Sequence, residues 1–188
     1  MKLLRTIRLD ASDGFVYDRA AAPGEWAVPG AFEFLDGDAG SLAGRSRQAF
    51  RAGFLGLGSF GWSTLVIAVE AQPEERAAAI ESLARYLLSE HGAPDADAAR
   101  AAATEEIAYA ESLAQHPPDT LIAMHRTIDA EGVIREQFRT LHRADAAAGQ
   151  MPCSAGAFAI VEDDERQALQ PGEEIDLAAL AQAKGAKP

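Results

Sequence analysis

Residues 56–61 read Gly-Leu-Gly-Ser-Phe-Gly, a literal GxGxxG motif. This spacing binds the pyrophosphate of a dinucleotide when the glycines follow a strand and open a helix. Here the order is reversed, because residues 41–53 predict a helix and residues 62–70 predict a strand. We therefore favour a structural role, in which the glycines allow close approach of the backbone while bulky neighbouring side chains fill the core.

Anion binding is the alternative role for this glycine loop. Its backbone N–H groups would surround an anion, and arginines close in sequence or on a later hairpin would add positive charge. This role fails if internal hydrogen bonds already use the N–H groups. For the hairpin arginines, ion pairing across the strands is the competing and favoured interpretation. The candidate ligand-binding residues are Gly56, Gly58, Gly61, Arg51, Arg135 and Arg139.

Cysteine and histidine offer little further chemistry. Cys153 is the only cysteine, so it forms no internal disulfide, which fits a reducing compartment. As a nucleophile it would need a nearby base such as His125 or His142, but most lone cysteines are small buried apolar residues. The four histidines show no H-x-x-x-H spacing, so we expect no metal site. We expect His91 and His116 near helix C-termini, where their charge is favourable.

The common catalytic motifs are missing from the sequence. It contains no G-x-x-x-x-G-K-[ST], no G-x-S-x-G and no C-x-x-C, which argues against P-loop phosphoryl transfer, α/β-hydrolase chemistry and zinc-ribbon binding. The acidic residues 162–165 lack the spacing of a calcium loop. We therefore assign no catalytic residue and expect no cofactor.

Composition predicts one acidic globular domain over residues 1–188. The chain is 48% hydrophobic and carries a formal net charge of −12. Such a charge repels nucleic acid and anionic membrane surfaces, so we expect neither as a partner. Arginines interrupt the apolar N-terminal residues, and the longest strongly apolar run, 65–69, is too short to span a bilayer. We expect a cytoplasmic protein.

The apolar patterning predicts an α+β fold, with a mostly antiparallel sheet and helices packed on one face. Ser41 is the expected N-cap of a first helix, and Pro73 the first residue of a second. The second helix and a third, beginning near Asp95, would form a helical hairpin. Residues 129–132 would be the turn of a β-hairpin. The expected strands cover 2–9, 15–19, 26–35, 62–70, 120–128, 133–141 and 156–161, the expected helices 41–52, 73–91, 95–116 and 175–183, and a frayed tail 184–188.

Several segments resemble a bacterial domain family of unknown function. They are residues 1–13 (MKLLRTIRLDASD), 24–28 (GEWAV), 49–56 (AFRAGFLG) and 59–61 (SFG). The resemblance runs over most of the chain and transfers no catalytic residue. It implies that relatives are encoded near accessory proteins of molybdenum-dependent formate dehydrogenases and a biotin/lipoate ligase-like protein, which favours an accessory role.

Two functional hypotheses follow. The first is a non-catalytic accessory protein that binds another protein, for instance in enzyme maturation, or that binds a second copy of itself. The second is a domain, either a binding protein or an enzyme, that takes a small molecule or anion through the glycine loop and nearby arginines. Free ligand at about 100 times its dissociation constant would stabilise the fold by about 2.7 kcal/mol, so thermal shift separates the two.

Overall fold

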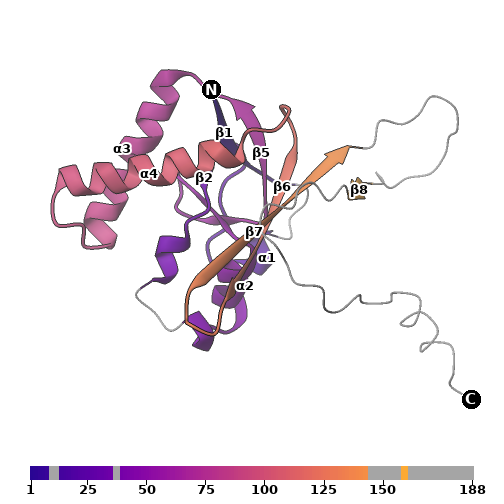
Figure 1. Cartoon of the computed structure of the whole chain (residues 1–188), viewed down its shortest axis with the longest axis horizontal. Coiled ribbons are helices and arrows are strands. Elements are labelled where there is room, and N and C mark those ends of the chain that lie inside the picture. The colour runs from indigo at the N-terminus through magenta and orange to yellow at the C-terminus, as the bar shows by residue number, and fades with distance from the viewer. Residues whose placement is uncertain (9–12, 36–38, 144–157, 161–188) are drawn as a thin grey trace, which may run out of the picture.

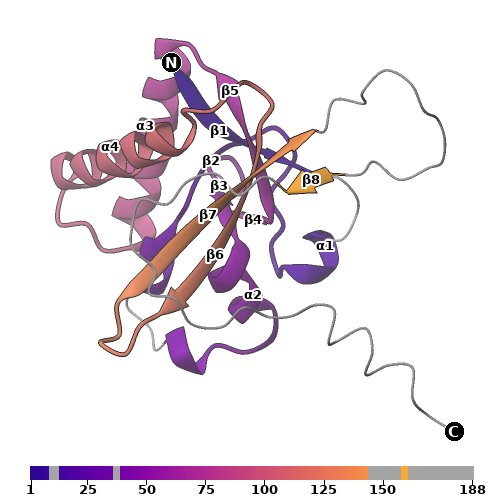
Figure 2. The same cartoon turned by 45° about the vertical axis from the view of Figure 1, so that its right-hand side comes forward.

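The computed structural model describes residues 1–8, 13–35, 39–143 and 158–160 of the chain. Its named strands form a single antiparallel sheet in the order β4-β3-β2-β1-β5-β6-β7-β8, shown in Figures 1 and 2. This sheet, together with the helices, confirms the predicted α+β class. The strands are β1 (Lys2–Ile7), β2 (Trp26–Val28), β3 (Phe54–Gly56), β4 (Trp62–Ser63), β5 (Leu65–Glu70), β6 (Leu121–Ile128), β7 (Ile134–Arg143) and β8 (Phe158–Ile160).

The first strand lies at the centre of the sheet. β1 pairs with β5 along its whole length, and Leu4 lies opposite Ala68 while Thr6 lies opposite Val66. All four side chains are at most 2% exposed, as alternation predicts for a covered face. The apolar run 65–69 is therefore a central strand.

Two long helices form the predicted helical hairpin. α3 (Pro73–Glu90) begins at Pro73, and the Glu75 side chain accepts a hydrogen bond from the backbone of Gln72 at 2.9 Å. α4 (Ala96–Leu113) begins after Asp95, whose side chain caps the backbone N–H of Ala98 at 2.8 Å. The two helices pack together, and α4 contacts β1 and β2, so the pair covers one side of the sheet (Figure 1).

The predicted β-hairpin is also confirmed. β6 and β7 pair continuously from Leu121 opposite Leu141 to Ile128 opposite Ile134. In the connecting turn Gly132 adopts a positive φ of 81° and donates its N–H to the Asp129 carbonyl at 3.1 Å. The predicted strand 156–161 corresponds to β8, whereas the predicted helix 175–183 and the tail lie outside the described residues.

The strand predicted over 15–19 is wrong, because a short helix, α1 (Asp13–Val16), stands at its start. Tertiary hydrogen bonds hold this segment: the Thr64 hydroxyl lies 2.8 Å from the Asp13 carboxylate and 3.0 Å from the Tyr17 hydroxyl. Contacts distant in sequence therefore override the strand propensity of the aromatic and β-branched residues.

The predicted strand 26–35 is shorter than expected, because β2 stops before Pro29, which has no N–H to donate to a sheet. Gly30 follows with a positive φ of 73°, and the 3₁₀ helix η1 (Ala31–Phe34) replaces the rest of that strand. A second 3₁₀ turn, η2 (Ala39–Ser41), precedes α2 (Gly44–Ala52). The expected N-cap is therefore wrong: residue 43, not Ser41, occupies that position.

Among the described residues, no helix combines the length and the apolar character needed to cross a bilayer.

Candidate functional site

The glycine loop encloses a carboxylate of the protein itself. One oxygen of Glu25 accepts hydrogen bonds from the backbone N–H groups of Gly58 at 2.9 Å and Ser59 at 2.8 Å, and from the Ser59 hydroxyl at 3.1 Å. The other oxygen accepts from the backbone of Ala22 at 2.8 Å. Burial alone would raise the pKa of Glu25, but these hydrogen bonds outweigh it and lower the pKa.

The remaining N–H groups of the loop are also used within the protein. Gly56 donates to the carbonyl of Gly61, and Gly61 donates to the Ser59 hydroxyl at 3.2 Å. The N–H groups of residues 57 and 60 likewise bond to backbone carbonyls. The condition that counts against the anion role is thus met, because an anion would have to displace Glu25 from Gly58 and the internal acceptors from Gly56 and Gly61. Binding at these three glycines stays a prediction.

Steric contacts explain why glycine stands at these positions. A Cβ atom on Gly61 would lie 2.7 Å from backbone atoms of Ala20 and Ala21, and one on Gly56 would lie 2.6 Å from the Glu25 carboxylate. No side chain fits at such separations without moving the backbone or the carboxylate. Close approach of the chain is the structural role that the sequence favoured.

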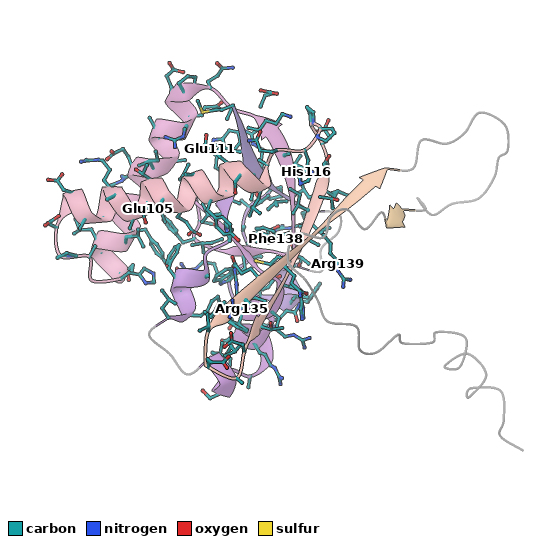
Figure 3. All side chains as sticks on the ribbon, in the orientation of Figure 1. Glu105, Glu111, His116, Arg135, Phe138 and Arg139 are labelled. Atoms are coloured by element: carbon teal, nitrogen blue, oxygen red, sulfur yellow. The ribbon has the colours of Figure 1, made fainter. Side chains whose placement is uncertain are left out.

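The three predicted arginines do not gather at the loop. Arg51 lies in the last turn of α2, and Arg135 and Arg139 lie along β7 (Figure 3). Arg135 forms an ion pair at 2.8 Å with Asp129, which lies in the hairpin turn, and Arg126 pairs across the strands with Glu136 at 2.8 Å. Within the described part of the chain, no hydrogen bond joins any of these arginines to the glycine loop.

A cavity of about 310 Å³ adjoins the loop and shares its residue Phe60. This volume is at the lower end of the range for small-molecule sites and suits a compact molecule rather than a dinucleotide. Five separate segments supply the lining: Asp18, Arg19, Glu33, Phe34, Arg45, Ser46, Ala49, Phe60, Trp62 and Tyr86.

Aromatic side chains form two stacked pairs in the cavity wall. The rings of Phe34 and Trp62 lie 5.3 Å apart at an interplanar angle of 27°, and those of Phe60 and Tyr86 lie 3.8 Å apart at 6°. Phe60 adopts a positive φ of 50°, a conformation that costs a non-glycine residue about 1–3 kcal/mol. The surrounding structure thus holds this ring against a backbone preference, and such strain is concentrated at functional sites.

The acidic groups of the cavity already have partners. Glu33 lies 3.2 Å from the His91 ring nitrogen and is hydrogen-bonded to the Tyr86 phenol. Burial, followed by this hydrogen bond and the charge of Glu33, raises the pKa of Tyr86 well above its ordinary range. Asp18 forms an ion pair with Arg45 at 3.3 Å. His91 is also the C-cap of α3, close to where the sequence placed it.

A buried arginine, Arg126, holds together the elements that line the cavity. Arg126, which is 0% exposed, donates to Glu136 at 2.8 Å and to the carbonyls of Phe50 at 2.8 Å and Pro29 at 2.6 Å. Its guanidinium also lies 5.5 Å from the ring of Phe34. These bonds tie β6 to α2 and to the segment that precedes η1. α2 and η1 in turn supply much of the cavity wall.

The sequence analysis missed both the cavity and the role of Arg126. A usable signal existed for the arginine, because Arg126 shares strand parity with Ile122 and Met124, which face the core. No comparable signal marked the cavity, since its lining comes from distant segments. Cys153 lies outside the described residues, so its relation to His125 is not part of the described structure.

The described residues contain no group of three or more histidine, cysteine, aspartate or glutamate side chains placed to hold a metal ion.

The chain matches a protein-family model described as a family of unknown function (DUF6505) over residues 1–159. The chain belongs to this family. No curated protein and no solved structure matches the chain.

Proposed function

We propose that the protein binds a small molecule with a flat ring in the cavity between α2, η1, α3 and the glycine loop. The observation that carries this proposal is the pair of aromatic stacks in the wall of a 310 Å³ cavity. Flat aromatic walls favour a flat ligand, because ring-to-ring contact adds to the burial of apolar surface. The ligand-binding hypothesis thus moves from the glycine N–H groups to the neighbouring cavity.

The strained backbone at Phe60 supports the same proposal. Gly61 packs against the backbone of residues 20 and 21, and Glu25 bonds to the N–H groups just before Phe60. The loop is therefore fixed on both sides of Phe60, which keeps the ring in place over Tyr86. A wall that is ordered before binding reduces the entropic cost of taking up a ligand.

Binding of the neutral ring compound benzamide tests the proposal. Titration followed by ligand-observed NMR compares the wild type with Ser46→Trp, which places an indole in the cavity lining. The matched control is Ser112→Trp on α4, where the replaced serine is also exposed but does not line the cavity. We expect benzamide to bind the wild type and the control but not Ser46→Trp. Equal binding to all three, or none to the wild type, would contradict the proposal.

Protein binding is a second proposal, consistent with the accessory role and with self-association. Its specific support is two exposed apolar side chains next to cavity-lining segments: Phe15 is 75% exposed and Leu35 is 68% exposed. The double variant Phe15→Ser/Leu35→Ser tests it by affinity capture from lysate and by light-scattering mass. We expect a stoichiometric partner, or a dimer, with the wild type only. A monomeric wild type that captures no protein argues against it.

A further inference from the structure

Two polar side chains of the cavity lining have no hydrogen-bonding partner among the described residues. Glu33 is bonded to Tyr86 and His91, and Asp18 is bonded to Arg45. By contrast, among the described residues, the Arg19 guanidinium has no hydrogen bond and no ion pair. The Ser46 hydroxyl is likewise without a hydrogen bond to any described group. The cavity therefore offers a positive charge and a hydroxyl to whatever enters it.

We infer, on the basis of the proposed function, that the ring ligand carries a carboxylate that Arg19 binds. A guanidinium presents parallel N–H donors that match the two oxygens of a carboxylate. Arg19 and Tyr86 line the same cavity, so a ring that stacks against the Phe60–Tyr86 wall would share that cavity with the guanidinium.

A preference of the cavity for an anion would contrast with the negative charge of the whole protein. A net charge of −12 disfavours anions over most of the surface. Within the cavity lining, however, Asp18 and Arg45 offset each other, and the Glu33 carboxylate is already hydrogen-bonded to Tyr86 and lies 3.2 Å from the His91 ring. Arg19 is thus the arginine of the lining without an ion-pair partner among the described residues, and its guanidinium favours a negatively charged group beside it.

Three ring compounds of similar size but different charge test the inference: benzoate, benzamide and benzylamine. Their dissociation constants are measured for the wild type, for Arg19→Gln and for the control Arg139→Gln, which alters an exposed arginine outside the cavity lining. We expect benzoate to bind the wild type and the control about fivefold more tightly than benzamide, with benzylamine weakest. In Arg19→Gln the advantage of benzoate should disappear.

The outcomes separate the two claims. If benzamide binds and Ser46→Trp blocks it, but benzoate has no advantage, the proposed function stands and the carboxylate inference is overturned. The inference is also overturned if the advantage of benzoate persists in Arg19→Gln. If none of the three compounds binds the wild type, both claims fail.

Discussion

The glycine loop and the cavity beside it share Phe60 but differ in how far their polar groups are already used. In the loop, Glu25 takes the place that an external anion would occupy, and internal acceptors take the other N–H groups. In the cavity, the Arg19 guanidinium and the Ser46 hydroxyl have no hydrogen-bonding partner among the described residues. A motif known for binding ligands is here part of the scaffold, whereas the neighbouring cavity, which has no motif, keeps polar side chains without a hydrogen-bonding partner among the described residues.

The largest expected effect concerns the support of the cavity. Replacing Arg126 with methionine removes the donor to Glu136 and to two buried carbonyls, so we expect a loss of about 3–5 kcal/mol in the free energy of unfolding. Urea denaturation measures this change. A loss below about 1 kcal/mol would show that water or rearranged side chains replace these bonds.

The next effect concerns the loop. Gly61→Ala places a Cβ 2.7 Å from the backbone of residues 20 and 21, and such crowding should cost about 1–3 kcal/mol of stability. The matched control is Gly14→Ala, because a Cβ on Gly14 would meet no atom within 4 Å. Similar denaturation midpoints for the two variants would mean that the loop is not tightly held.

Substitution of Glu25 tests whether its charge fills the loop. In Glu25→Gln the size is kept but the charge-assisted hydrogen bonds are lost, which should cost about 1–2 kcal/mol at pH 7. Because folding lowers the pKa of Glu25 from its ordinary 4.5, its stabilisation is complete above that value and is lost as the pH falls through the folded pKa. The difference between wild type and Glu25→Gln should therefore shrink in acid. A difference independent of pH would count against the charge.

The smallest expected effect on folding belongs to the cavity. Ser46 is exposed and its hydroxyl forms no hydrogen bond with a described residue, so Ser46→Trp should change stability by no more than about 0.5 kcal/mol while blocking benzamide. Thermal unfolding of the unliganded variant provides the measurement. A large loss of stability would mean that the indole disrupts the fold, and the variant could not then be compared with the wild type.

The elements whose boundaries depend on local chemistry could be predicted from the sequence. Pro73, Asp95 and the turn before Gly132 marked boundaries that the structure confirms, because capping and turn geometry depend on a few adjacent residues. α1 was missed because the hydroxyl of Thr64, distant in the chain, holds Asp13 and Tyr17.

The site was harder to predict than the fold. A local motif drew attention to the glycines, but their role depended on Glu25, which lies about thirty residues earlier and gives no sign of pairing with them. The cavity brings together residues from position 18 to position 86, so no window of sequence contains it. Such a site follows only from the packing of α2, η1 and α3 around the loop.

A titration with benzoate, followed by the backbone amide and tryptophan indole resonances of the wild type, tests the central claim most directly. The account predicts that the amides of Arg19 and Ser46 and the indole of Trp62 shift on binding, while those of Gly58 and Ser59, which are bonded to Glu25, do not. Shifts that are largest at Gly58 and Ser59, with little change at Arg19, would show that the ligand binds at the glycine loop and would contradict the account.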